Sequence, residues 1–203
     1  MFTGIVEAVG EVIALVPDAD QVSRRLAVAS PLARDLELGE SVSVNGVCLT
    51  VIAQTDAEFF MQISPTTLRL TTLGGLRPGQ RVNLERSVTP ATRLGGHWVL
   101  GHVDTVGRIQ AVTPEGEARH VEVAFPPEYG RWVLPQGSIA IDGVSLTIVK
   151  VGEGSLTVTL IPHTLAHTIL SHWQSGTAVN LEFDVLGKFV EHLLAPYRAV
   201  KEG

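Results

Sequence analysis

The chain has 203 residues, enough for one large domain or two small ones. The 15 Lys and Arg residues against 21 Asp and Glu residues give a net charge of −6. This charge argues against a nucleic-acid-binding protein, because such proteins carry a basic face. Apolar residues make up 45% and charged residues 18%, so the chain can bury a core and disorder is not expected. Its single cysteine, Cys48, excludes an intramolecular disulfide and a cysteine-rich zinc site. We see no signal peptide and no stretch of about 18 apolar residues, so we expect a cytoplasmic protein that does not enter membranes.

A repeat at an offset of 97 residues organises the sequence. Four windows align at this offset without a gap: Gly4–Gly10 with Gly101–Gly107, Gly46–Thr50 with Gly143–Thr147, Pro65–Leu73 with Pro162–Leu170, and Val82–Glu85 with Val179–Glu182. Chance can supply one such window, whereas four at one offset indicate a duplication. We expect two homologous domains, residues 1–97 and 98–187, followed by a tail, residues 188–203.

Each repeat is expected to form a small antiparallel barrel with one short helix. Apolar and polar residues alternate over 41–45, 138–142, 155–160 and 179–185, which predicts strands with one buried face. Asn45-Gly46 and Asp142-Gly143 predict tight hairpin turns. Many short strands with frequent turns favour a closed barrel, which has no free sheet edge. Residues 66–73 and 164–170 follow a proline and are apolar at three- and four-residue spacing, which predicts the helices.

The tail carries a helical pattern. Its apolar residues recur at three- and four-residue spacing: Leu186, Phe189, Val190, Leu193, Leu194 and Tyr197. Pro196 is expected to end or kink this helix. Two uses of the apolar stripe are open, because it can cover the C-terminal barrel or join copies of the chain.

Positions at which the two repeats differ are candidates for chemistry. His102 stands where the first repeat has Ile5, and Cys48 stands opposite Ser145. Each has a plain alternative, because a strand histidine is most often structural and a free cysteine is most often a small buried side chain. The matched pairs Thr50/Thr147 and Thr67/Thr164 are either ordinary strand and cap threonines or two equal sets of hydroxyls for a polyol or heterocycle.

Other chemistries find little support. In an extended chain His97 and His102 face opposite sides, which argues against a shared metal. Ser145, His102 and Asp104 or Asp142 could form a hydrolytic triad, but no Gly-x-Ser-x-Gly elbow is present. The sequence contains no P-loop, no dinucleotide-binding glycine motif and no His-Glu-x-x-His zinc motif.

Five segments together carry a family resemblance. They are Met1–Glu7, Asn45–Thr50, Gly95–His97 with Gly101–Asp104, Ile141–Thr147, and Ile161–Leu165. They resemble riboflavin synthase of the alpha-chain type, which has two lumazine-binding repeats, and the resemblance runs from Met1 to about Val190. It implies an all-β fold of two tandem, homologous, six-stranded antiparallel Greek-key barrels with a C-terminal α-helix.

The resemblance also implies a reaction. In this family two molecules of 6,7-dimethyl-8-ribityllumazine exchange a four-carbon unit, giving riboflavin and 5-amino-6-(D-ribitylamino)uracil, in the last step of riboflavin biosynthesis. The chain would be a transferase without metal or other cofactor, with no nucleic-acid or membrane partner. The family is a homotrimer in which the N-terminal barrel of one subunit meets the C-terminal barrel of the next, and the tail would be its trimerising helix.

The family's binding residues fall into two pockets. The first comprises Gly4, Ile5, Val6, Ser145, Leu146, Thr147, Leu160, Ile161, Pro162, His163, Thr164 and Leu165, and the second comprises Cys48, Leu49, Thr50, Gln62, Ile63, Ser64, Pro65, Thr66, Thr67, Gly101, His102 and Val103. We expect His102 and Thr147 to assist proton transfer. Cys48 and Ser145 are expected to orient or activate the nucleophile, for which water is one candidate.

Two positions depart from the family pattern. Gln136 stands where the family usually carries a lysine that makes a contact across the subunit interface, and Thr66 stands where it often carries a glutamate. Two alternatives to the enzyme are kept. A non-catalytic, antenna-type protein would bind lumazine or flavin but would be expected to lose the motifs of one repeat, whereas both repeats keep theirs. A purely structural barrel protein would bind no ligand.

Overall fold

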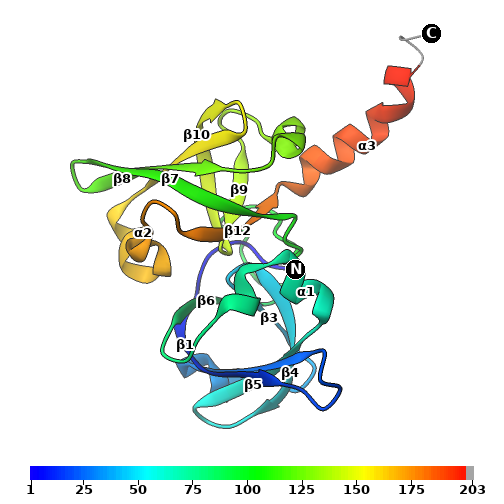
Figure 1. Ribbon diagram of the computed structural model, residues 1–203, viewed down its shortest axis with the longest axis vertical. Coiled ribbons are helices and arrows are strands. Elements are labelled where there is room, and N and C mark those ends of the chain that lie inside the picture. Colours follow the sequence, from blue (N-terminus) through cyan, green and yellow to red (C-terminus); the bar gives the residue numbers. More distant parts are fainter. Residues whose placement is uncertain (200–203) are drawn as a thin grey trace.

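The computed structural model, which describes residues 1–199, contains two closed six-stranded barrels and a C-terminal helix (Figure 1). The N-terminal barrel consists of β1 (Ala8–Pro17), β2 (Arg24–Ala29), β3 (Ser41–Val44), β4 (Val47–Gln54), β5 (Glu58–Ile63) and β6 (Arg81–Arg86). The C-terminal barrel consists of β7 (Thr105–Glu115), β8 (Ala118–Ala124), β9 (Ser138–Ile141), β10 (Val144–Gly152), β11 (Ser155–Leu160) and β12 (Ala178–Phe183). The predicted fold class is confirmed.

The two barrels share one topology. The strand order is β1-β2-β5-β4-β3-β6 in the first barrel, and the second repeats it with β7 to β12. Connections between strands that are not neighbours carry the short helices. In the first barrel these are η1 (Pro31–Asp35), α1 (Pro65–Leu70) and η2 (Thr72–Gly75), and in the second they are η3 (Pro127–Trp132), α2 (Pro162–His167) and η4 (Ile169–His172).

Strand alternation gives each barrel its own core. On β4, Val47, Leu49 and Val51 are buried inside the barrel, while Cys48 and Thr50 lie on the outer face. β10 repeats this pattern and places Ser145 and Thr147 outside. The polar and sulfur-bearing residues that the sequence singles out are therefore on outer faces, where a ligand can reach them.

The hairpins at Asn45-Gly46 and Asp142-Gly143 meet between the barrels. All four residues have positive φ, from 46° to 79°, as the tight turns predicted for them require. The turns touch, because a Cβ on Gly46 would lie 2.7 Å from the backbone N of Gly143. The barrels are thus related by an approximate twofold axis that passes near these turns.

Two matched asparagines join the barrels across this axis. Asn83 Nδ2 donates to the carbonyl of Asp142 at 2.9 Å, and Asn83 Oδ1 accepts from the backbone N–H of Ile169 at 2.9 Å. Asn180 repeats both contacts at 2.8 Å with the matched residues Asn45 and Thr72. Because both asparagines are buried and bonded through both ends of their amides, they fix how the barrels abut.

The predicted short helices are present, but each is divided by a threonine. Thr71 separates α1 from η2 with an extended backbone, and its hydroxyl accepts from the N–H of Leu73 at 3.3 Å. The same hydroxyl donates to the carbonyl of Thr67 at 2.7 Å, which ends α1. Between α2 and η4, the hydroxyl of Thr168 likewise donates to the carbonyl of Thr164 and accepts from the N–H of Leu170.

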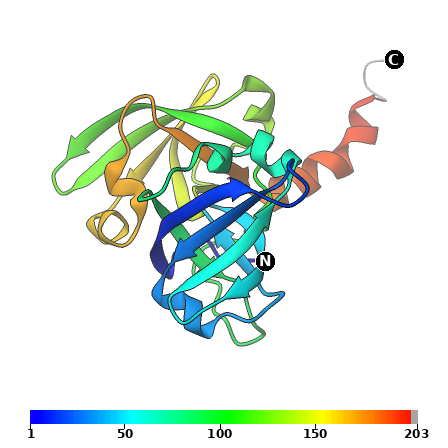
Figure 2. The same ribbon diagram turned by 60° about the horizontal axis from the view of Figure 1, so that its bottom comes forward.

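The C-terminal helix α3 (Val185–Ala199) projects away from the barrels (Figures 1 and 2). Its start is docked by Lys188, whose Nζ lies 2.6 Å from Asp104, and by Glu191, 3.5 Å from Arg131. The predicted apolar stripe is exposed over its whole length, so the idea that it covers the C-terminal barrel is wrong. The helix also runs through Pro196 rather than ending there, because a proline near a helix end removes only one late hydrogen bond.

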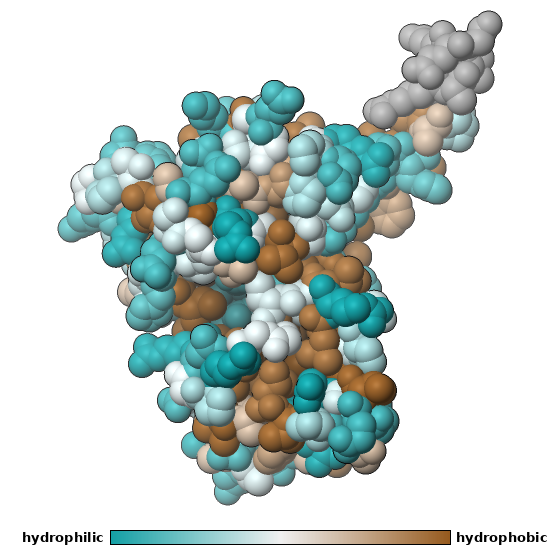
Figure 3. All heavy atoms as spheres, viewed as in Figure 1, coloured by the Kyte–Doolittle hydropathy of each residue, from teal (hydrophilic) through white to brown (hydrophobic). Residues whose placement is uncertain are grey.

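None of the helices within residues 1–199 is long and apolar enough to span a bilayer. Apolar groups do reach the surface elsewhere, and Figure 3 shows several of them at the waist between the two barrels. Ile5 and Trp98, which belong to segments that connect the barrels, are both about half exposed, at 50% and 46%.

Candidate active site

The segment that precedes each barrel lies against the other barrel. Ser145 on β10 donates its backbone N–H to the carbonyl of Gly4 at 2.8 Å, and Cys48 on β4 donates to the carbonyl of Gly101 at 2.9 Å. The start of the first repeat therefore lies over the outer face of β10 on the C-terminal barrel, and the start of the second repeat lies over the outer face of β4 on the N-terminal barrel. We call these two candidate binding surfaces the Ser145 pocket and the Cys48 pocket.

The segments that precede the two barrels, which we call the crossing segments, need glycine where they pass over the strands of the opposite barrel. Gly4 and Gly101 have φ values of +77° and +80°, which side-chain-bearing residues rarely adopt. A Cβ on Gly4 would lie 2.6 Å from Cβ of Ser145, and one on Gly101 would lie 2.5 Å from Cβ of Cys48. The close approach places each backbone directly over the candidate residue of the opposite barrel.

Two matched glutamates hold these segments in place. Glu182 accepts the backbone N–H groups of Leu100, Gly101 and His102 at 2.6–2.9 Å. Glu85 holds Thr3 and Gly4 in the same way at 2.6–3.0 Å. Burial raises the pKa of both carboxyl groups, although the hydrogen bonds act in the opposite direction. Sequence reasoning did not select these residues, and the signal that could have found them is the identical Val-Asn-Leu-Glu in both repeats, with polar side chains on buried strands.

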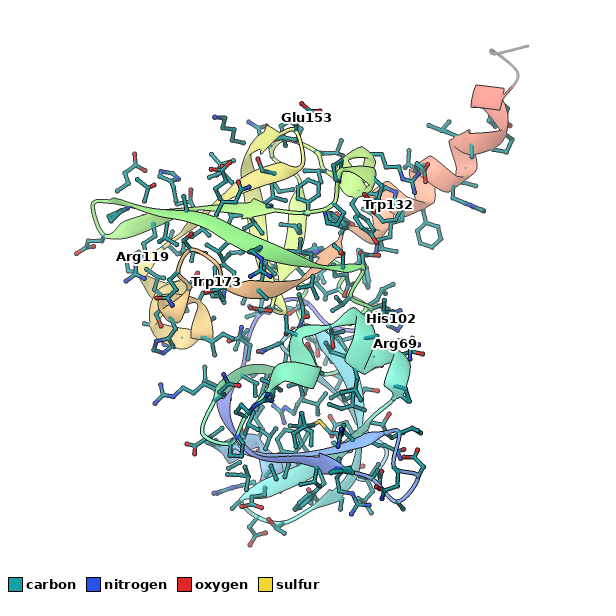
Figure 4. The ribbon with its side chains drawn as sticks, viewed as in Figure 1. Arg69, His102, Arg119, Trp132, Glu153 and Trp173 are labelled. Atoms are coloured by element: carbon teal, nitrogen blue, oxygen red, sulfur yellow. The ribbon has the colours of Figure 1, made fainter. Side chains whose placement is uncertain are left out.

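In the Cys48 pocket the predicted residues divide between surface and core. Cys48 is half-buried, whereas Thr50 and His102 are exposed, and Figure 4 labels His102 on the same side of the molecule as Arg69 of α1. Val103 and Leu68 of α1 both pack against the N-terminal core, which brings helix and crossing segment to the same barrel. The remaining predicted residues include Leu49 and Ile63, whose side chains lie in the core, so these two can offer a ligand only backbone groups.

The residues at the start of α1 are also predicted to line the Cys48 pocket. Ser64 caps this helix by accepting from the backbone N–H of Thr67 at 3.1 Å, and the two hydroxyl groups lie 3.0 Å apart. Gln62 and Thr66 are exposed and Pro65 is half-buried. The Gln62 side chain donates to Asp18 at 2.6 Å.

The Ser145 pocket repeats this arrangement on the other barrel. Thr147, Ile5, Ile161 and His163 are exposed, whereas the side chains of Leu146 and Leu160 lie in the C-terminal core. Val6 and Leu165 of α2 pack against that core as their counterparts do in the first barrel. Pro162 and Thr164 belong to α2, and Gln136 is exposed with φ of 63°.

One histidine makes the two pockets unequal. His97 is buried, and its Nδ1 lies 2.8 Å from Oγ of Ser145. Burial lowers the pKa of this imidazole, and the nearby carboxylate of Asp184 opposes the shift. The thiol of Cys48 has no hydrogen-bond partner within residues 1–199. The residue 97 positions after His97 is Leu194, an exposed residue of α3.

The triad considered from the sequence is not assembled. Ser145 pairs with His97 rather than His102, whose backbone N–H is held by Glu182. Asp104 accepts from the backbone of Phe183 and binds Lys188, and Asp142 lies between the barrels. Ser145 pairs with His97 because the segment that joins the two repeats passes over β10, and the hydrophobic periodicity of the sequence does not reveal that path. In the described part of the chain, no three His, Cys, Asp or Glu side chains are grouped as metal ligands would be.

The two pockets of one chain face apart. α1 and α2, which border the Cys48 and Ser145 pockets, lie on opposite sides of the molecule in both ribbon views (Figures 1 and 2). A hollow of about 700 Å³ lies between the barrels, and neither Cys48 nor Ser145 lines it. Each candidate surface has an exposed threonine, Thr50 or Thr147, that a second molecule can reach.

Comparisons with known proteins agree with this architecture. The lumazine binding domain matches residues 3–87 and again residues 100–184. The riboflavin synthase of Mycobacterium tuberculosis is 44% identical in an alignment of 199 residues that covers 96% of this chain and 98% of that protein. The riboflavin synthase of Bacillus subtilis is 38% identical over 194 residues, 96% of this chain and 90% of that protein.

Solved structures show the same fold. LumP in complex with 6,7-dimethyl-8-(1'-D-ribityl) lumazine has a TM-score of 0.80 at 26% identity, covering 90% of this chain and 98% of that chain. LumP in complex with riboflavin has a TM-score of 0.83 at 25% identity, covering 90% and 99%. With two matches to the lumazine binding domain and relatives of this similarity over nearly its whole length, the chain belongs to the riboflavin synthase family and carries one lumazine binding domain in each barrel.

Proposed function

We propose that the protein dismutates two molecules of 6,7-dimethyl-8-ribityllumazine into riboflavin and 5-amino-6-(D-ribitylamino)uracil. One observation carries the proposal: the fold presents two matched pockets that differ at the residues able to do chemistry. The reaction requires two copies of one molecule in opposite roles. A duplicated fold provides two like sites, and the differences at Cys48/Ser145 and Ile5/His102 provide the two roles.

Each pocket offers the groups that the substrate needs. Backbone N–H and C=O groups of the crossing segments can pair with the uracil-like edge of the pteridine. The exposed hydroxyls of Thr50 and Thr147 can bind the ribityl chain. Holding both molecules in contact is worth several kcal/mol of the barrier, roughly 7 or more in well-oriented cases.

We assign the proton transfers and the nucleophilic attack to the four outward-facing residues. His102 and Thr147 would assist removal of a proton from the acidic C7 methyl group and its return. Cys48 and Ser145 would orient the nucleophile that attacks the other lumazine. No metal or redox cofactor enters the proposal.

We propose that the complete active site forms between copies of the chain, in a homotrimer. The pockets of one chain lie on opposite sides, so they cannot hold two lumazines face to face. The exposed apolar stripe of α3 is a surface that a copy can cover. The Cys48 pocket of one subunit would then meet the Ser145 pocket of the next.

A second candidate function is lumazine or flavin binding without catalysis. It is favoured by the structural likeness to LumP, whose structures contain the lumazine and riboflavin. It is disfavoured by the presence of His102, Cys48 and Ser145 together, because a pure binder has no need of two chemically distinct pockets.

Conversion of the lumazine alone separates the two functions. We expect purified protein in chelator, given only 6,7-dimethyl-8-ribityllumazine, to form riboflavin and the pyrimidine in equal amounts over many turnovers, measured by absorbance and chromatography. Lumazine that is bound but never converted would establish the binding protein instead. Ultrafiltration without any retained lumazine would leave only a structural role.

A further inference from the structure

We propose that His97 is a positioning residue that acts through Ser145, and that it makes the Ser145 pocket the place where the four-carbon donor is attacked. This inference rests on the proposed dismutation and goes beyond it, because the differences at Cys48/Ser145 and Ile5/His102 do not say which pocket holds the donor. His97 belongs to the junction between the repeats and serves only one of them.

The geometry connects imidazole and hydroxyl directly. The 2.8 Å between Nδ1 and Oγ is hydrogen-bond distance, and the backbone N–H of His97 donates to the carbonyl of Thr3 at 3.1 Å. Thr3 is itself held by Glu85, so the imidazole is carried by the same crossing segment that completes the pocket. A Cβ on Gly96 would lie 2.1 Å from the Thr3 carbonyl oxygen, so this approach requires glycine before the histidine.

The surroundings favour a neutral imidazole that can accept a proton. Burial opposes the charged form and lowers the pKa of His97. Asp184, between β12 and α3, is the carboxylate whose charge reaches the ring, and it stabilises the imidazolium once a proton arrives. Glu85 faces Thr3 and Gly4 of the crossing segment, and both of its carboxylate oxygens accept hydrogen bonds from them.

The proton of the attacking water reaches His97 through Ser145. A water molecule adds to the ring carbon that bears the C7 methyl group, so that a C–O bond forms, a water O–H bond breaks and the ring keeps the displaced π pair on its pyrimidinedione oxygen. The water proton passes to Oγ of Ser145 while the Ser145 proton passes to Nδ1 of His97. The serine hydroxyl thus passes its proton to the histidine, as the activated serine does in enzymes that use a serine and histidine pair.

Within residues 1–199 no imidazole is hydrogen-bonded to the Cys48 thiol, and this difference from Ser145 sets the two roles. Cys48 packs against the small cluster of Phe2, Val99 and Ala140, and His102 stands at the exposed edge of the pocket. That arrangement suits removal of a proton from a bound methyl group, so activation of the nucleophile, which the proposed function shares between Cys48 and Ser145, falls to Ser145. The lumazine in the Cys48 pocket is thus the four-carbon acceptor and the one in the Ser145 pocket the donor.

The test uses His97→Asn, which keeps a polar side chain but cannot take up a proton. We expect turnover to fall about 100-fold or more while lumazine affinity stays within about threefold. Wild-type turnover should decline on the acidic side, because an imidazolium cannot accept the Ser145 proton, and this limb of the pH profile should vanish in the variant. His120→Asn, on β8 outside both pockets, is the matched control and should keep wild-type turnover.

Two further readouts separate this role from a structural one. His97→Asn with Ser145→Ala should be no slower than Ser145→Ala alone, because both act on one step. Protein-catalysed deuterium exchange at the C7 methyl group, followed by NMR, should persist in His97→Asn and be lost in His102→Gln.

The outcomes distinguish the two proposals. A wild-type protein that forms no riboflavin overturns the proposed function and this inference with it. An active wild type whose His97→Asn variant keeps its turnover overturns the inference alone. So does a variant whose loss adds to that of Ser145→Ala, or one that loses methyl exchange and lumazine binding together.

Discussion

Replacing Asp142 by asparagine should make the protein more stable at pH 8 than the wild type, and the advantage should disappear by pH 4. Asp142 is fully buried between the barrels, where burial raises its pKa to about 7 from the ordinary 3.8. Its contribution to stability is therefore fully present below pH 4 and is lost as the pH rises through 7. A shift of this size corresponds to roughly 4 kcal/mol between the two ends of the range.

Asparagine is the residue that the other repeat uses at this place. Asn45 Oδ1 accepts the backbone N–H of Asn83 at 2.7 Å, as Asp142 Oδ1 accepts that of Asn180 at 2.8 Å. The second oxygen of Asp142 also accepts Trp173 Nε1 at 3.3 Å, and losing that bond costs about 1 kcal/mol at every pH. We would measure urea unfolding at several pH values, with the exposed Asp56→Asn as the control for lost charge. A difference in unfolding free energy that does not change with pH would contradict this account, because it would show that the pKa of Asp142 is the same in the folded and unfolded states.

Replacing Gly101 by alanine should abolish turnover and destabilise the fold by about 3 kcal/mol or more. Its Cβ would lie 2.5 Å from Cβ of Cys48 and 2.9 Å from Cε2 of Phe2, and neither a strand nor a fully buried ring can easily move. The crossing segment would lift from β4 and carry His102 with it. Steady-state kinetics and urea unfolding measure the two effects.

Gly39→Ala is the matched control for this change. Gly39 has φ of +86°, close to that of Gly101, but an added Cβ would meet nothing within 4 Å. It should cost only about 1 kcal/mol, the price of the left-handed backbone, and leave turnover unchanged. Equal losses in the two variants would mean that backbone conformation, rather than the contact with Cys48, accounts for the glycine at position 101.

Much of the fold can be predicted from the sequence because both repeats show the same alternation of apolar and polar residues and the same turn residues. Alternation on β4 and β10 places Cys48 and Ser145 outside their barrels, and the Asn-Gly and Asp-Gly turns require the positive φ that they adopt. Each of these is a local rule that acts within a few residues. The same rules place the helices, and only the breaks at Thr71 and Thr168 depend on side-chain hydrogen bonds that periodicity does not report.

The candidate site was less predictable, because its contacts join distant segments. The division into two pockets came from family resemblance, and the structure shows a physical basis in the glutamates that hold each crossing segment on the opposite barrel. The pairing of His97 with Ser145 depends on the path of the junction, which no periodic pattern encodes. Pro196 is a further example, since docking of the helix start by Lys188 and Asp104 does not depend on the residues near its end.

We propose that each turnover uses one pocket of each kind, taken from different copies of the chain. The most direct test of this shared site is to co-express Ser145→Ala with His102→Gln, each of which disables one pocket, and to measure riboflavin formation by the purified mixed oligomer. In random assemblies about a quarter of the interfaces would pair two intact pockets, so we predict activity well above that of either variant alone. Ser145→Ala co-expressed with Thr147→Val, which alters the same pocket, should show no recovery. A mixed oligomer no more active than the average of its parents would contradict the shared site.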